Sequence, residues 1–187
     1  MLKEEKEYLE EFGEVPKDFI GRLDYILKDT NLKRCKLKIY DEINRITSIK
    51  WNKLSYTIYL LPKATPRPRM GNRGVFYVKG SKNNKKIMEK FIKEQDITLI
   101  TTSVKFTCTT YYPIPKSMNP MEKILSELGF IRPISKPEWD NVATAYCDMI
   151  IGYLIYYDSQ IIEGSSSKFY SSKPRIEIEI EYMDVYD

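Results

Sequence analysis

Apolar and polar residues alternate most regularly near the end of the chain. In residues 174–182, isoleucine and glutamate take alternate positions, which predicts a strand with one buried face and one face in water. The preceding residues 161–170 are predicted as a second strand, antiparallel to the first. Segments 54–61 and 97–112 are rich in β-branched and aromatic residues, and the longer of the two suits a central strand. Two shorter strands are predicted at 75–78 and 153–157.

Helical spacing of apolar residues predicts the remaining elements. We expect helices over residues 3–12, 16–29 and 32–47, and further along the chain over 85–94, 121–128 and 141–151. Gly129 and Gly152 directly follow the last two and suit helix C-termini. The segment KATPRPRMGNRG, residues 63–74, contains two prolines and two glycines and is therefore expected to be irregular.

This succession of elements predicts an α+β fold, a mixed β-sheet covered by helices. The first fifty residues hold helices and no obvious candidate site. Residues 1–50 are therefore interpreted as an added helical N-terminal extension that packs or contacts a partner, and residues 51–187 as the main domain. A chain of 187 residues is long enough to bury a substantial core.

Several classes of protein are excluded by composition. No run approaches twenty apolar residues, so no membrane span is expected, and the charged first residues lack a secretory core, so we expect a cytoplasmic protein. Cys35, Cys108 and Cys147 lie far apart, which favours buried reduced thiols over a disulfide framework. The chain has no histidine, which removes Ser–His and Cys–His catalysis and His-ligated zinc.

Positive charge is concentrated in residues 63–93, called here the basic segment. It carries a net charge of +9, whereas the rest of the chain carries −5. Such a block suggests a polyanionic partner such as a nucleic acid, although a solvated face would look the same. The candidate phosphate-binding residues are Arg67, Arg69, Arg73, Lys79, Lys82, Lys85 and Lys86, together with Lys136 outside the segment.

Four carboxylates, Glu138, Asp140, Asp148 and Asp158, gather among apolar residues in the stretch 136–160. Asp140 is predicted as a helix N-cap, with Thr144 and Asp148 following at i+4 and i+8 on one stripe of the helix. Glu138 would point the same way in an extended chain, and Asp158 would return after the next strand. Such oxygen ligands suit Mg²⁺ or Mn²⁺. Alternatively, Asp140 only caps the helix and Asp158 only begins a turn.

The chain resembles the RusA family of Holliday-junction resolvases, particularly its phage and prophage branch, from about Leu54 to Tyr182. The resemblance rests on an ordered set of motifs. These are Arg67 and Arg69 in TPRPRMGNRGVFY, then Pro113, Pro115, Lys116 and Ser117, then Lys136, Pro137, Asp140, Asn141, Asp148, Asp158, Gln160 and Ile161, and finally the closing KPRIEIEIEY.

The resemblance implies a homodimeric endodeoxyribonuclease that depends on Mg²⁺, or on Mn²⁺, and nicks branched DNA such as four-way junctions in DNA recombination and repair. Residues 51–187 would be its nuclease domain. The family's catalytic and metal-binding acids map onto Glu138, Asp140 and Asp158, with a metal-bound water as nucleophile. Asp148 matches a further family acid, either an additional metal ligand or a residue that orients the helix.

Three positions depart from the family pattern. Glu138 replaces an aspartate, Thr144 stands where the family has a catalytic lysine, and Tyr157 replaces the first acid of an Asp–Asp pair. Loss of one donor that stabilises transition-state charge typically costs roughly 10²–10³ in rate. Three hypotheses remain open: an active endonuclease, a weakened or inactive relative that binds branched DNA, and an interaction protein whose acidic cluster is structural and whose N-terminal helices bind a protein.

Overall fold

The chain divides into two compact units in the computed structural model, Met1–Ile49 and Lys50–Asp187. The structure describes residues 2–14, 16–28, 36–63, 69–71, 74–76, 86, 89–90, 93 and 99–183.

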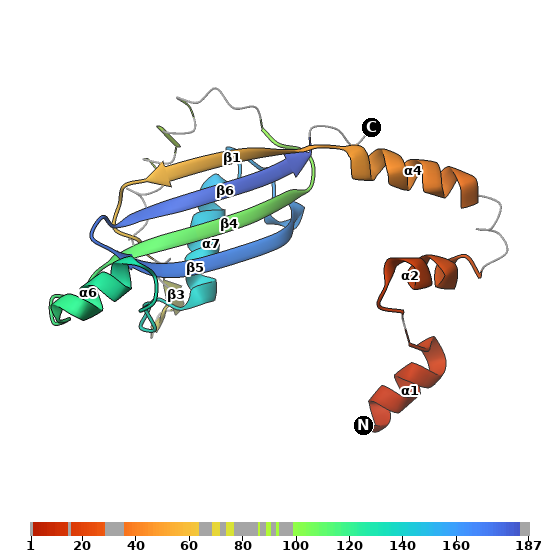
Figure 1. Ribbon diagram of the computed structural model, residues 1–187, viewed down its shortest axis with the longest axis horizontal. Helices are drawn as coiled ribbons and strands as arrows, with labels where there is room; N and C mark the ends of the chain where they lie inside the picture. The colour runs from red at the N-terminus through yellow and green to blue at the C-terminus, as the bar shows by residue number, and fades with distance from the viewer. Residues whose placement is uncertain are drawn as a thin grey trace. The chain divides into compact units, whose positions relative to one another are not determined.

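The N-terminal unit contains, in its described part, the helices α1 (Lys3–Phe12), α2 (Phe19–Ile26) and α4 (Lys36–Ser48) (Figure 1). The three predicted N-terminal helices are therefore confirmed in type. The second begins later than predicted because Asp18 is its N-cap: the Asp18 carboxylate accepts a hydrogen bond from the backbone N–H of Gly21 at 2.7 Å.

The second unit is built on a mixed four-stranded sheet with the strand order β1-β6-β4-β5 (Figure 1). β6 is antiparallel to both of its neighbours, β1 and β4, whereas β5 runs parallel to β4 at the edge. The predicted α+β class with a mixed sheet is thereby confirmed. The strands are β1 (Trp51–Ile58), β4 (Val104–Pro113), β5 (Ile161–Ser171) and β6 (Arg175–Met183).

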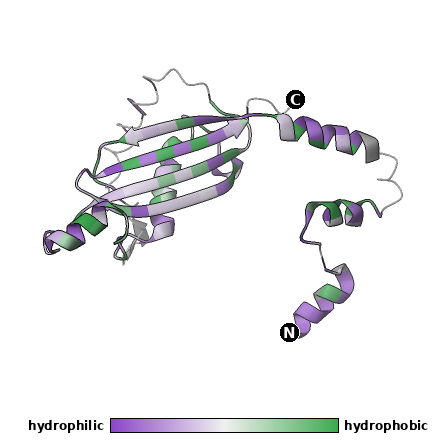
Figure 2. Ribbon diagram, viewed as in Figure 1, coloured by the Kyte–Doolittle hydropathy of each residue, from purple (hydrophilic) through white to green (hydrophobic). Residues whose placement is uncertain are grey.

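The last two strands run antiparallel, as predicted, but they are not neighbours, because β4 lies between them. The reason is burial. Buried and less buried residues alternate over Val104–Tyr111 of β4 and over Arg175–Glu181 of β6, whereas β5 is exposed over much of its first half. The two strands with the most complete apolar faces therefore take the central positions of the sheet. Figure 2 shows the matching alternation of hydrophobic and hydrophilic residues along β6.

The prediction that residues 63–74 are irregular is wrong at Arg69–Gly71. This segment forms β2, which pairs antiparallel with β3 (Gly74–Phe76). Gly71 lies opposite Gly74 in the register. The two glycines therefore do not prevent the pairing of these short strands. The strand predicted at 75–78 is confirmed over the part that β3 covers.

Helices α6 (Pro120–Glu127) and α7 (Trp139–Ile150) connect the parallel strands β4 and β5, which need such a crossover. The apolar side of α7 packs on one face of the sheet and closes the core. That core combines residues of α7 and of the strands, among them Val142, Tyr146, Met149, Ile150, Ile176, Ile178 and Ile180. The isoleucines predicted to be buried in β6 are therefore confirmed.

One predicted strand is absent from the structure, and one predicted helix is only partly described. The strand predicted at 153–157 does not form. Gly152 has a positive φ and its N–H donates to the Ile155 carbonyl at 2.6 Å, so the chain turns here, and Ile155 makes only isolated bridges to Ile100 and Ile151. Of the helix predicted at 85–94, residues 86, 89, 90 and 93 are described and helical; the others lie outside the described residues.

In the described part of the chain, no helix is long and apolar enough to cross a membrane. Cys108 is buried and Cys147 is half-buried, both as free thiols, and Cys35 lies outside the described residues.

Candidate active site

The start of α7 carries two of the four predicted carboxylates. Glu138, not Asp140, occupies the N-cap position, since its carbonyl accepts the first helical hydrogen bond, from Val142 N–H at 3.2 Å. Asp140 lies in the first turn, and its carbonyl accepts a hydrogen bond from the Thr144 hydroxyl at 2.9 Å. The prediction of Asp140 as N-cap is therefore wrong by two positions. The Glu138 side chain makes no capping hydrogen bond and is exposed.

Strand β5 holds the start of α7 through two side chains. The indole N–H of Trp139 donates to the Ser166 carbonyl at 2.7 Å. The Lys168 ammonium donates to the carbonyls of Ser135 and Pro137 at 2.9 and 3.0 Å. Because β5 is an edge strand, its outward backbone groups are free for such contacts. Glu138 is thus held from both sides, by the segment before it and by the residue after it.

A pocket of about 240 Å³ lies where α7 meets the β4–β5 side of the sheet. Two of the four carboxylates, Asp148 and Asp158, line it together with Trp139, Thr144 and Cys147. Asp158 begins a short 3₁₀ helix, Asp158–Gln160, which leads directly into β5. The structure therefore brings together one acid from the last turns of α7 and one from the start of the edge strand.

The electrostatics of this pocket reflect two acids close together. Partial desolvation of its carboxyl group, and then the negative charge of Asp158, raise the pKa of Asp148. Burial, followed by the charges of the same two acids, raises the pKa of the Cys147 thiol to about 11. Cys147 is therefore a protonated, unreactive thiol at neutral pH. The repulsion between Asp148 and Asp158 would be relieved by a cation between them.

Gln160 fixes the segment that carries Asp158. Its side-chain oxygen accepts hydrogen bonds from the backbone N–H groups of Tyr156 and Tyr157, at 2.7 and 3.0 Å. Its side-chain nitrogen donates to the carbonyls of Ile100 and Thr102, each at 3.0 Å. This residue was recognised in the sequence as a motif match without a role. The structure gives it one: its amide ties the 3₁₀ helix to the segment that leads into β4.

The four acids do not form one group. Among the described residues, no three or more acidic or cysteine side chains lie where they could together hold a metal ion. Asp140 and Asp148 are eight residues apart on α7, hence about 12 Å apart along the helix axis. The pocket unites Asp148 and Asp158, while Glu138 and Asp140 lie exposed at the other end of the helix. Their catalytic roles remain predictions.

Comparison with known proteins relates this arrangement to a family. The model of the family described as "Endodeoxyribonuclease RusA" matches residues 60–181, about two thirds of the chain. The chain belongs to the RusA family. It is also 32% identical over 135 residues to the uncharacterized protein YqaN of Bacillus subtilis (strain 168), an alignment that covers 68% of this chain and 94% of YqaN. The region matched by the family model includes all four acids and the whole basic segment, and the RusA resemblance inferred from the motifs is confirmed.

The basic segment of this RusA-family protein is only partly described. Arg67, Arg73, Lys79, Lys82 and Lys85 lie outside the described residues. Arg69 lies in β2, whose backbone alone is described, and the side chains of Lys86 and Lys136 are exposed. Sequence reasoning did not single out Arg132, whose guanidinium lies 3.8 Å from the Phe169 ring centroid and donates to the Lys168 carbonyl.

Two tyrosines anchor the basic segment. The hydroxyl of Tyr146, buried on α7, accepts a hydrogen bond from the Lys63 backbone N–H at 2.9 Å, at the start of the segment. The hydroxyl of Tyr153 donates to the Glu89 carboxylate near its end. Both tyrosines belong to α7 or to the turn that follows it. The basic segment is therefore attached at one point to α7, which carries Asp140 and Asp148, and at a second point to the turn that follows α7.

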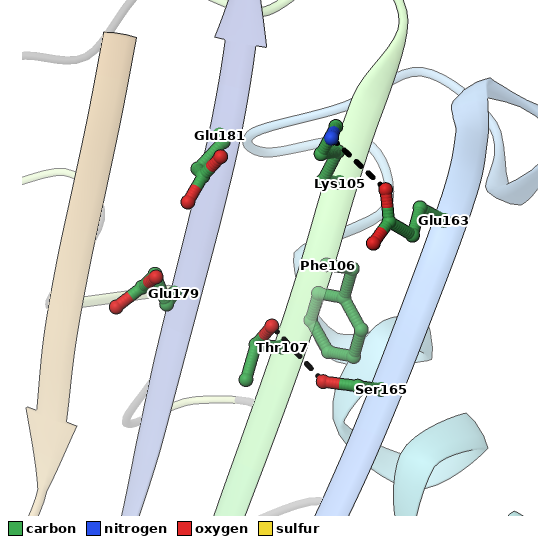
Figure 3. A pocket seen from close by; sticks show the side chains of 7 residues that line it. All are labelled: Lys105, Phe106, Thr107, Glu163, Ser165, Glu179 and Glu181. Carbon is green, nitrogen blue, oxygen red and sulfur yellow. Dashed lines mark hydrogen bonds and ion pairs between the residues drawn. The ribbon is translucent and has the colours of Figure 1, made fainter. Parts of the chain in front are cut away.

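The sheet face opposite α7, called here the outer face, carries more acidic than basic side chains around its pocket. A shallow pocket of about 130 Å³ on it is lined by Glu163, Glu179, Glu181 and Lys105, among others (Figure 3). Lys105 pairs with Glu163 at 2.9 Å, and Lys53 pairs with Glu179 at 2.6 Å. Acids outnumber bases among these five residues. The outer face is therefore a poor surface for a polyanion, which favours the α7 side for DNA binding in this RusA-family protein.

Proposed function

We propose that this protein is an endonuclease that depends on Mg²⁺ or Mn²⁺ and nicks branched DNA, in particular four-way junctions, in DNA recombination and repair. The observation that carries the proposal is the pocket shared by Asp148 and Asp158 within the region matched by the RusA family. We further propose that Met1–Ile49 is a helical extension added to this nuclease domain.

The side chains of the pocket fit a divalent cation. Mg²⁺ is usually held by one or two carboxylates and completes its shell with waters and substrate phosphates. Asp148 and Asp158 supply such a pair, and the pKa of Asp148 is raised first by partial desolvation of its carboxyl group and then by the negative charge of Asp158. When bound, the ion would supply activation of water and neutralisation of charge on the leaving oxygen. Glu138 and Asp140 would then act with Asp158 as catalytic acids, as the resemblance implies.

DNA would be bound by the basic segment and by the residues near the start of α7. Lys136 and Arg132 are both exposed there, beside the segment held by β5. Contacts to phosphates fix the position of DNA without reading its sequence, so recognition by shape is expected. Affinity would fall steeply with salt. A homodimer with two-fold symmetry would present two such sites to a symmetric junction.

A second candidate function, a weakened or inactive protein that binds branched DNA, is favoured by Thr144. This residue lines the pocket, and its hydroxyl donates to the Asp140 carbonyl. A catalytic lysine at this position would place a cation beside Asp148 and Asp158, and threonine cannot. The missing charge would reduce stabilisation of the developing phosphate charge.

The test of the first proposal is nicking of a synthetic four-way junction in the presence of Mg²⁺ or Mn²⁺. We expect cleavage by the wild type and a loss of at least about 100-fold in Asp158→Asn and Asp140→Asn. Asp41→Asn, in the exposed part of α4, is the matched control and should cleave normally. Full activity in both site variants would refute the assignment of these acids.

The second candidate makes a different prediction. The wild type would bind the junction in a salt-sensitive manner and cleave it with neither metal, whereas Thr144→Lys combined with Glu138→Asp would restore cleavage. A double variant no faster than the wild type would show that these two departures do not limit activity.

A further inference from the structure

We infer that Trp139 forms a stacking site for an unpaired nucleobase beside the candidate active site, and that this site helps to distinguish branched DNA from continuous duplex. The inference deepens the proposed function and rests on it for its biological meaning. Its physical basis is the position, exposure and attachment of one side chain.

Trp139 is fixed although it is exposed. Its side chain retains 56% of its accessible surface, an unusual fraction for tryptophan. The hydrogen bond from its indole N–H to the Ser166 carbonyl, at 2.7 Å, holds one edge of the ring system against β5. A large aromatic surface that is both exposed and held in one orientation can bind a planar ligand without first losing its own conformational freedom.

The surroundings of the ring suit a nucleobase. Trp139 borders the pocket that contains Asp148 and Asp158, and it lies in the chain between Glu138 and Asp140. Apolar groups of the same pocket include Phe106 and Ile161. Its volume of about 240 Å³ is smaller than the roughly 300–1,000 Å³ of pockets for drug-sized ligands. It therefore has room for a single ring system next to the acids.

Two further exposed aromatic rings lie in the chain directly before Asp158. Tyr156 and Tyr157 directly precede Asp158, are 50% and 66% exposed, and have ring centroids 6.2 Å apart. Aromatic side chains bind successive unpaired bases by stacking, whatever the sequence. Both parts of the candidate active site thus carry exposed aromatic surface directly beside a carboxylate.

The ligand must be an unpaired base, because the bases of a continuous duplex are covered on both faces by their neighbours. At a branch point or a bulge, a base can leave the stack and reach the protein. Stacking on Trp139 would then add affinity for such DNA and none for duplex. The loss on removing one stacking ring is expected to be roughly 5- to 150-fold in affinity.

The experiment uses the full chain in a chelating buffer, so that binding is measured without cleavage. Trp51 and Trp139 are the two tryptophans, so Trp51→Phe leaves Trp139 as the reporter of fluorescence. The probes are a duplex and the same duplex with one unpaired base at its centre. We expect the unpaired base to quench Trp139 and the duplex to leave it unchanged. Equal quenching by both probes, or quenching by neither, would overturn the inference.

Variants separate base stacking on Trp139 from the structural role of its hydrogen bond to the Ser166 carbonyl of β5. Trp139→Phe loses the hydrogen bond to Ser166 but keeps an aromatic ring, whereas Trp139→Leu loses both. We expect Trp139→Leu to lose roughly 5- to 150-fold in affinity for the unpaired-base probe, with duplex affinity unchanged, and Trp139→Phe to lose clearly less. Equal losses in the two variants, or equal losses for the two probes, would contradict stacking.

A matched control is Tyr59→Leu, which removes another exposed ring, 73% accessible, and should bind both probes normally. Cleavage assays with Mg²⁺ report separately on the proposed function. A protein that cuts nothing but recognises the unpaired base would overturn the nuclease proposal alone. A protein that cuts junctions while Trp139→Leu binds both probes normally would overturn the stacking site alone.

Discussion

The ammonium group of Lys168 lies 3.0 Å from the carbonyl oxygen of Pro137 and thereby joins the edge strand β5 to the segment before α7. A second hydrogen bond, to the Ser135 carbonyl, strengthens this contact. The contact positions Glu138, the next residue in the chain, from a strand that follows it by about thirty residues.

Replacing Lys168 with methionine keeps an aliphatic side chain and removes the ammonium group. Two carbonyls then lose their donor, and the segment before Glu138 is no longer held. Because a displacement of about 1 Å can cost roughly 100-fold in rate, we expect single-turnover nicking to fall about 10- to 100-fold. Lys173→Met, at an exposed lysine near the β5–β6 turn, is the control. A similar loss in both variants would argue against a positioning role.

Gln160 offers a test of the segment that carries Asp158. Gln160→Leu removes four hydrogen bonds to backbone groups, and we expect the free energy of unfolding to fall by about 2–4 kcal/mol. Urea denaturation followed by circular dichroism measures it. Gln160→Glu keeps an acceptor for the two tyrosine N–H groups but places a carboxylate oxygen against the Ile100 and Thr102 carbonyls, so a loss at least as large as in the leucine variant is expected at neutral pH. If the leucine variant is as stable as the wild type, the four bonds contribute nothing net.

Asp148 should make stability depend on pH and on divalent metal. Because the pKa of Asp148 is raised in the folded state, protonation of its carboxyl group favours folding. This contribution to stability is fully present below the unfolded pKa and is lost as pH rises through the folded pKa. In a chelating buffer, Asp148→Asn should therefore melt at a higher temperature than the wild type at neutral pH. That difference should shrink at acid pH, where Asp148 is protonated in both states.

A divalent metal ion should stabilise the wild type more than the variants that lack one of the two acids. A cation bound by Asp148 and Asp158 stabilises the folded state by mass action, so millimolar Mg²⁺ or Mn²⁺ should raise the melting temperature of the wild type. The rise should be clearly smaller in Asp148→Asn and in Asp158→Asn. Differential scanning fluorimetry across a metal titration measures it, and equal shifts in all three proteins would exclude this pair as the metal site.

Glu127 makes a stability contribution of the opposite sign. Desolvation of the carboxyl group disfavours its charged form, but hydrogen bonds from the Ser172 N–H at 2.6 Å and the Ser171 hydroxyl at 2.8 Å prevail and lower the pKa of Glu127. This stability is present above the unfolded pKa of roughly 4.3 and is lost as pH falls through the folded pKa.

We therefore expect Glu127→Gln to lower the free energy of unfolding by about 1 kcal/mol at pH 7, a value near the lower limit for a charged group because the side chain is exposed. The two proteins should approach each other in stability below the folded pKa. Glu10→Gln, on the exposed surface of α1, should behave like the wild type throughout. A pH-independent difference would mean that the Glu127 charge is not the cause.

Local patterns predicted the elements well. The alternation in 174–182 corresponds to β6, and helical spacing corresponds to α1, α6 and α7, because these periodicities are set by residues close together in the chain. The prediction of a strand at 153–157 was wrong because it, too, used only residues close together in the chain. Its apolar residues fill the core beneath a turn made by Gly152, and burial alone does not distinguish a buried turn from a strand.

The site was predicted in part. The four acids, the departure at Thr144 and the RusA resemblance all follow from the order of residues along the chain, because a motif is local or depends on sequence order alone. Which acids lie close together in space does not follow from the order of residues. Spacing on α7 suggested Asp140 and Asp148 as companions, whereas the fold places Asp148 beside Asp158 and leaves Asp140 two helical turns away.

The sequence by itself determined the family, the α+β class, the buried face of β6 and the types of residue available for chemistry. Tertiary structure alone decided that β4 separates β5 from β6, that Lys168 and Gln160 hold the two halves of the candidate site, and that Trp139 is exposed yet fixed. These are contacts between residues about thirty to sixty positions apart. They depend on which strand occupies the sheet edge, and that choice is made by the burial of the whole core instead of by any one segment.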